Sequence, residues 1–125
     1  MKNLIILLTI FLFQIPVFAQ QQEKIISTFE SGNVENFSQY LDENVDLTIL
    51  STEGIYSKAQ SKVLLKNFFA TNTPSKFTLQ HQGGGEMAKY VIGSLVANNK
   101  TYRVYFLFKK NNDKTIIQKL RIEND

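Results

Sequence analysis

The chain of 125 residues contains no cysteine and only one histidine, His81. The lack of cysteine excludes disulfide bonds, thiolate metal sites and the cysteine-linked lipid anchor of bacterial lipoproteins. With a single histidine, only carboxylates remain as further metal ligands, and no Asp or Glu stands at ligand spacing beside His81. We therefore expect no metal and no cofactor, and a domain that is held together by burial of its core alone.

The main apolar run lies at the N-terminus, in residues 4–13, and is too short to span a membrane. Lys2 precedes it, and residues 17–19 follow with small side chains at the two positions that a signal peptidase reads. This layout predicts a signal peptide over residues 1–19 and one mature domain over residues 20–125, although an N-terminal core helix is an alternative. We expect the mature chain to be soluble, to lack a transmembrane segment, and to be exported to the periplasm or the extracellular space.

Acidic and basic side chains are unevenly distributed along the chain. Residues 20–57 carry one lysine and seven carboxylates, whereas residues 58–125 carry twelve lysines and arginines and four carboxylates. The two halves either attract each other within one fold or leave a basic surface for an acidic partner or a polyanion. Export from the cytoplasm argues against nucleic acid as that partner.

Three segments carry helical signals. Apolar residues recur at helical spacing over residues 25–29, before Gly32, which ends the segment. Asn33 is a suitable cap for a second, short helix. A third helix is predicted over residues 58–71, with Ser57 as its N-cap. Its exposed side carries Lys58, Lys62 and Lys66.

Strand signals occupy the rest of the mature chain. Residues 45–50 and 55–56 alternate as a strand and its short partner. Four further strands are predicted after residue 74, over residues 76–82, 88–97, 100–110 and 114–123. The order is helix, helix, strand, strand, helix and four strands. It predicts an α+β layer fold in which three helices, all in the N-terminal half, pack on a curved antiparallel sheet.

The apolar faces of the last two strands predict their register. A three-residue loop at residues 111–113 puts Val104 opposite Leu120 and Phe108 opposite Ile116, with the aromatic face in the core. The second face of the sheet is then too apolar for an ordinary solvated surface, which predicts a contact between subunits. This second face consists of Tyr90, Ile92, Arg103, Tyr105, Leu107, Ile117, Lys119 and Arg121.

Several short motifs, taken in their order along the chain, carry a family resemblance. They are Gly54-Ile55-Tyr56-Ser57-Lys58-Ala59-Gln60, the Phe68-Phe69 pair, His81 with Gly83, Tyr90-Val91-Ile92-Gly93, Tyr102-Arg103-Val104-Tyr105 and Leu120-Arg121-Ile122-Glu123. On these residues the mature chain resembles a secreted bacterial family catalogued as domain of unknown function 4783. The resemblance implies a nuclear transport factor 2-like cone, also called cystatin-like, with the order ααββαββββ. It implies no catalytic residues, although the wider superfamily includes isomerases, dehydratases and non-enzymatic dimers.

The candidate catalytic and binding residues are few. His81 shares a strand face with Phe77 and Leu79, so we expect it to point into the cone as a general base or as a structural residue. Asp46 begins a strand whose flanking residues are apolar, and it would be an acid or base if it faced inward. Its position beside Asn44 and Val45 favours the alternative, an exposed residue at the end of the strand. Tyr40, Tyr56 and Tyr102 would either line a pocket with their hydroxyls or fill the core with the oxygen at its rim. Tyr56 is also a catalytic candidate.

Three functions fit these residues. The first is a secreted, non-catalytic binding module that forms a homodimer through the second sheet face. The second is a small-molecule enzyme of the isomerase or dehydratase type, with His81 and either Asp46 or a tyrosine as acid and base. The third is a surface that binds an anionic glycan or a lipid headgroup through Arg103, Lys119 and Arg121. A small apolar or anionic molecule is the expected ligand.

Overall fold

In residues 17–125, which are the residues that the computed structural model describes, three helices and six strands follow one another in the predicted order. Residues 1–16 of the predicted signal peptide lie outside the described residues. The helices are α1 (Val17–Glu30), α2 (Val34–Ser38) and α3 (Lys58–Thr71). The strands are β1 (Leu41–Ile49), β2 (Thr52–Ser57), β3 (Pro74–Gly84), β4 (Ala88–Ala97), β5 (Lys100–Asn111) and β6 (Lys114–Asn124). The expected α+β class is confirmed.

Side-chain caps set the starts of two helices. Before α2, the side chain of Asn33 accepts a hydrogen bond from the backbone N–H of Asn36 at 3.1 Å. Before α3, Ser57 and Gln60 form a capping box, in which each side chain accepts a hydrogen bond from the other residue's backbone N–H. These local bonds fix the start of α3 at residue 58, which confirms the prediction.

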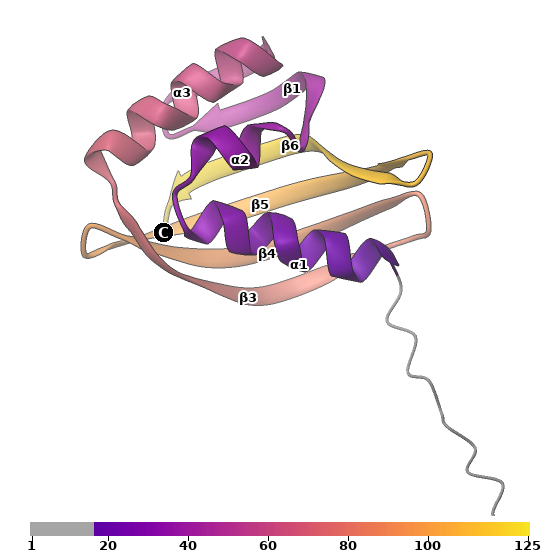
Figure 1. Ribbon diagram of the computed structural model, residues 1–125. Coiled ribbons are helices and arrows are strands. Elements are labelled where there is room, and N and C mark those ends of the chain that lie inside the picture. The colour runs from indigo at the N-terminus through magenta and orange to yellow at the C-terminus, as the bar shows by residue number, and fades with distance from the viewer. Residues whose placement is uncertain (1–16) are drawn as a thin grey trace, which may run out of the picture.

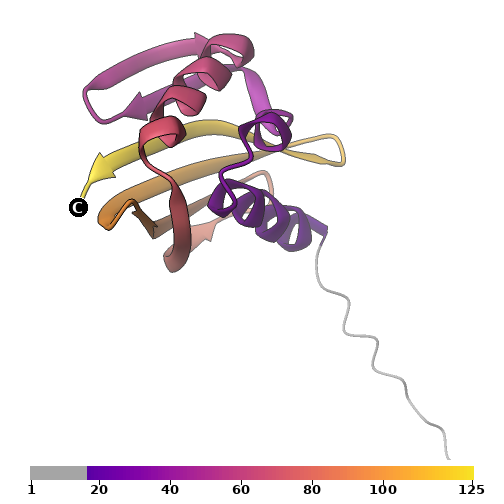
Figure 2. The same ribbon diagram turned by 60° about the vertical axis from the view of Figure 1, so that its left-hand side comes forward.

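One curved sheet contains all six strands in the order β2-β1-β6-β5-β4-β3. Neighbouring strands are antiparallel, apart from β1 and β6, which run parallel. The three helices lie on the same side of this sheet, with α1 against β3 and β6 and α3 against β1 and β2 (Figures 1 and 2). The sheet therefore has an inner face, covered by helices, and an outer face that no helix of residues 17–125 covers.

Phenylalanine side chains fill the space between the helices and the inner face. The ring of Phe29 in α1 lies 5.2 Å from Phe37, 5.4 Å from Phe69 and 5.0 Å from Phe106, centroid to centroid. Most of these pairs are tilted or edge-to-face, which is the arrangement that aromatic rings prefer. Val91, Val104 and other strand residues that alternate with the outer face complete this core.

The hairpin between β4 and β5 matches its prediction. Asn98 and Asn99 have φ angles of 54° and 64°, so both central residues of the turn adopt the left-handed conformation that asparagine tolerates. Ala97 pairs with Lys100 across the turn, and Val91, Gly93 and Leu95 face the core.

The predicted register between β5 and β6 is wrong. Lys114 pairs with Asn111, so the loop has two residues, and a β-bulge at Gln118 then adds one unpaired residue to β6. Val104 therefore lies opposite Ile122, not Leu120. The bulge also corrects a predicted interface residue: Ile117 pairs with Phe108 on the inner face and is fully buried in the core.

The expected direction of His81 is also wrong. Leu79 pairs with Gly93 on the inner face, but a bulge at Gln80 shifts the register, and His81 pairs with Ile92 on the outer face. Because one extra residue reverses the alternation of a strand, Gln82 takes the inward position opposite Val91. His81 is exposed to solvent and does not point into the cone.

Candidate functional site

The outer face of the sheet carries a strip of apolar and aromatic side chains at its centre. We call this the outer strip; it consists of Tyr90, Ile92, Tyr105 and Leu107 on the neighbouring strands β4 and β5. All four side chains are half-buried. The rings of Tyr90 and Tyr105 are nearly parallel, at 13°, with centroids 6.3 Å apart. Apart from Ile117, the residues of the predicted second face lie together on the outer face of the sheet.

Gly83 on β3 makes room for one of these rings. A Cβ atom at this position would lie 2.7 Å from the hydroxyl oxygen of Tyr90 and 2.8 Å from two of its ring carbons. The ring of Tyr90 therefore lies directly against the backbone of the next strand. A larger residue at position 83 would displace it and break the flat surface of the outer strip.

The basic residues beside the outer strip are paired with carboxylates. The Nζ atom of Lys119 lies 3.5 Å from Oδ2 of Asp46, and Nη2 of Arg121 lies 2.6 Å from Oε1 of Glu123. Arg103 is exposed and stands opposite Glu123 in the register of β5 and β6. The second face is therefore not the strongly positive surface that its lysine and arginines alone suggest.

The structure separates His81 from Asp46, one of its candidate partners in an acid–base mechanism. His81 lies on β3 and Asp46 on β1, with β4, β5 and β6 between them. At about 4.8 Å for each strand spacing, the two positions are roughly 19 Å apart across the sheet. Asp46 lies in the middle of β1 and not at a strand end, and its partly exposed side chain pairs with Lys119 on the outer face.

The three candidate pocket tyrosines do not share a cavity. The hydroxyl of Tyr102 is buried and donates a hydrogen bond to Oδ1 of Asn72 at 2.6 Å. Tyr56 lines an open depression of about 310 Å³ on α3, with Gln60, Val63 and Leu64. Tyr40 lines a second depression, with Lys24 and Lys114 among its neighbours. The three residues pack against the core, as the alternative interpretation expected.

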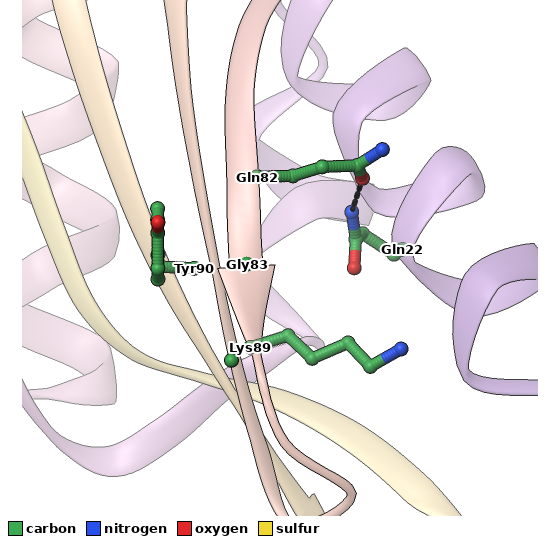
Figure 3. Close-up of a pocket in the computed structure, with 6 residues that line it drawn as sticks. Gln22, Gln82, Gly83, Lys89 and Tyr90 are labelled. Atoms are coloured by element: carbon green, nitrogen blue, oxygen red, sulfur yellow. Dashed lines mark hydrogen bonds between the residues drawn. The ribbon is translucent and has the colours of Figure 1, made fainter.

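A small polar hollow lies under the first half of α1, where sequence reasoning placed no site. It has a volume of about 120 Å³ and is lined by Gln22, Gln82, Gly83, Gly84, Lys89 and Tyr90. Gln22, Gln82 and Lys89 lie on the helix side of the strands and Tyr90 on the other (Figure 3). Nε2 of Gln22 donates to Oε1 of Gln82 at 3.4 Å. The inward turn of Gln82 depends on the bulge at Gln80, which no sequence signal marks.

Two lysines of the predicted solvated stripe form an ion cluster between α2 and α3. Glu35 accepts charged contacts from Lys62, at 2.5 Å, and from Lys66. The hydrogen bonds from these two ammonium groups lower the pKa of Glu35 from 4.5 to about 2. All three side chains remain partly or largely exposed, so this cluster joins two helices and does not form a reactive site.

The part of the chain that the structure describes contains no group of three or more histidine, aspartate or glutamate side chains that could hold a metal ion. In the same residues, no helix is long and apolar enough to cross a membrane.

Comparisons with known proteins agree with this architecture. The model of the family described as "Domain of unknown function (DUF4783)" matches residues 22–123. A DUF4783 family protein from Bacteroides uniformis is 30% identical, with a TM-score of 0.77, over 82% of this chain and 95% of that one. A DUF4783 family protein from Bacteroides fragilis is 27% identical, with a TM-score of 0.74, over 90% of this chain and 100% of that one.

A more distant neighbour supports the fold alone. A protein of unknown function with a cystatin-like fold, from Nostoc punctiforme, is 17% identical, with a TM-score of 0.67, over 89% of this chain and 93% of that one. The predicted nuclear transport factor 2-like, or cystatin-like, fold is confirmed. A search of curated proteins found no match.

Proposed function

We propose that this chain, which belongs to the DUF4783 family, is a secreted, non-catalytic binding module that pairs with a second copy of itself through the outer face of its sheet. The outer strip is the observation that carries the proposal. Its four side chains are half-buried in the single chain, and no helix of residues 17–125 covers them. A second copy would remove the rest of their apolar surface from water.

The charges around the outer strip favour a second copy over a polyanion. In a two-fold interface the same patch meets itself, so an excess of one charge would repel. Here Lys119 and Arg121 are each paired with a carboxylate of their own chain. This pairing reduces the attraction for an anionic glycan or lipid headgroup, and it leaves a near-neutral rim of the kind that surrounds protein interfaces.

Molar mass in solution tests the proposal. We expect light scattering at high micromolar concentration to give twice the mass of the monomer, and Leu107→Lys at the centre of the strip to give the monomer. Ile92→Lys, on the neighbouring strand, should act in the same way. Far-ultraviolet circular dichroism will establish that both variants are folded.

The matched control is Val63→Lys, since Val63 is 55% exposed on α3, away from the outer strip. It makes the same chemical change on another apolar surface residue and should leave the dimer intact. A wild-type chain that stays monomeric at high micromolar concentration would refute the proposal. The proposal would also be refuted if Val63→Lys dissociated the dimer and the two variants in the outer strip did not.

A further inference from the structure

Phe18 closes a depression at the start of α1. It is the penultimate residue of the predicted signal peptide, yet its side chain is only 9% exposed and belongs to the hydrophobic core. The Nζ atom of Lys89 lies 5.1 Å above the centroid of its ring. Phe18 borders a depression of about 230 Å³, and Lys89 borders the polar hollow of about 120 Å³. Cleavage after Ala19 would remove the ring that borders the larger depression and that lies under the ammonium group of Lys89.

The walls of this space do not depend on the residues that would be removed. Gln21 donates from Nε2 to the backbone oxygen of Asp113 at 3.0 Å, and its Oε1 accepts from the N–H of Thr115 at 2.7 Å. Gln22 is 7% exposed and bonds to Gln82. The first turn after the cleavage position is thus attached to β3 and to the β5–β6 hairpin. All the other buried apolar residues of the core lie between residues 25 and 122, so the mature chain keeps its core.

We propose that the mature chain binds a small aromatic carboxylate in the space that Phe18 leaves. Phe18 belongs to the buried apolar cluster, so its removal would expose apolar atoms of the core to water. The ring of a ligand would restore the contacts that the Phe18 ring makes. The ammonium group of Lys89 has no carboxylate within 4 Å in residues 17–125, so it is available to the acid group of the ligand. The site therefore selects an aromatic ring with an acid group one short chain away. This inference rests on cleavage after Ala19 and not on the dimer.

A titration with 3-phenylpropionate tests the site directly. We expect a chain that begins at Gln20 to bind it with a Kd on the order of 1 mM, as suits a ligand of this size. Nuclear magnetic resonance should place the shifted amide signals around Lys89, Gln22 and Thr115. The full chain, in which Phe18 fills the space, should bind at least about tenfold more weakly. Equal binding by the two chains, or no binding by the shorter one, would overturn the proposal.

Variants at Phe18 and Lys89 test the roles of the two residues separately. Phe18→Ala in the full chain opens the same space without shortening the protein, and it should bind like the chain that begins at Gln20. Lys89→Gln in that shorter chain should weaken binding of 3-phenylpropionate about tenfold and leave binding of the neutral 3-phenylpropanol unchanged. Met87→Ala, an exposed neighbour of Lys89 in sequence, should change neither. Equal losses for acid and alcohol would contradict a role for the Lys89 charge.

The mass of the exported protein tests whether the chain is cleaved after Ala19. We expect a mass that corresponds to a chain starting at Gln20. A mass that includes Phe18 would mean that the space stays closed in the cell, and the proposal would fail even if the truncated chain binds the probe.

Discussion

The ring of Phe77 occupies the place where a side chain of Gly93 would lie. Phe77 is on β3 and Gly93 on β4, and a Cβ atom at position 93 would approach Cζ of the ring to 2.2 Å and the backbone oxygen of Thr78 to 2.7 Å. The same ring contacts Phe29 and Phe106, with centroids 6.3 Å and 6.0 Å away. The missing side chain thus lets the edge strand β3 close over the aromatic core.

Gly93→Ala should destabilise the fold. The added methyl group must displace a packed ring or a backbone carbonyl, and overpacking of this kind costs about 1–3 kcal/mol or more. Urea unfolding will give the change in free energy. The control is Gly85→Ala, because no atom lies within 4 Å of a Cβ at that position. If Gly93→Ala left the free energy of unfolding unchanged, the ring of Phe77 would have to move aside freely.

The Glu35 cluster predicts a pH-dependent contribution to stability. The pKa of Glu35 is about 2 in the folded chain against 4.5 without its partners, so the folded state favours the charged form. Its contribution is therefore fully present above about pH 4.5 and is lost as the pH falls towards 2. Glu35→Gln should therefore lower the Tm at pH 7. The difference in Tm between the variant and the wild type should shrink as the pH falls from about 4.5 to 2.

Two controls accompany this measurement of the Glu35 cluster. Glu53→Gln removes an exposed carboxylate that has no salt bridge in residues 17–125. Its Tm difference from the wild type should not shrink between about pH 4.5 and 2. High salt should reduce the Glu35 effect at pH 7, because the three side chains are accessible to solvent. A Tm difference that is independent of both pH and salt would contradict an electrostatic origin.

The elements that could be predicted from the sequence are those with a local signal. The start of α3 depends on Ser57 and Gln60, three residues apart, and the β4–β5 turn depends on Asn98 and Asn99. Such signals lie within one turn of the chain and need no knowledge of the rest of the fold. The inward alternation along β4 and β5 was predictable for the same reason.

The bulges at Gln80 and Gln118 could not be predicted, because neither residue carries a signal of its own. Gln80 and Gln118 are ordinary polar residues. The bulge at Gln118 lets both Ile117 and Leu120 lie in the core, whereas no apolar residue follows Gln80 in β3. One bulge turns His81 outward and the other turns Ile117 inward, so both errors about candidate site residues have one cause. The contact between Glu35 and Lys66 was also out of reach, since it joins two helices that are distant in sequence.

His81→Ala should have almost no effect on stability. The side chain is exposed on the outer face and makes no hydrogen bond in the described residues, so we expect a change within about 0.5 kcal/mol. Phe77→Ala, four residues earlier and on the inner face, should cost about 3 kcal/mol. Urea unfolding of the two variants will give the free-energy loss for one residue on the outer face and one on the inner face of β3. A loss of more than about 2 kcal/mol for His81→Ala would indicate an inward side chain.

Tyr102→Phe should weaken the end of α3. The hydroxyl of Tyr102 donates to Oδ1 of Asn72, and Nδ2 of Asn72 donates to the backbone oxygen of Phe68. Loss of the hydroxyl leaves a part-buried amide oxygen without its partner, which costs about 1–2 kcal/mol. Thermal or urea unfolding measures the loss. Tyr56→Phe is the matched control, because the Tyr56 hydroxyl makes no hydrogen bond within residues 17–125, and it should be close to neutral.

Ser61→Ala should stabilise the protein. Ser61 is fully buried in α3, and its hydroxyl has no hydrogen-bond partner in residues 17–125. A buried hydroxyl without a partner loses its hydration, and alanine also has a helix propensity about 0.5 kcal/mol more favourable than serine. We expect the free energy of unfolding to rise by about 0.5–1.5 kcal/mol. Ser75→Ala is the contrasting variant, since the hydroxyl of Ser75 donates to the backbone oxygen of Val96 at 3.1 Å on an exposed edge. A clear loss of stability in Ser61→Ala would mean that this hydroxyl is hydrogen-bonded in solution and helps to hold α3 against the sheet.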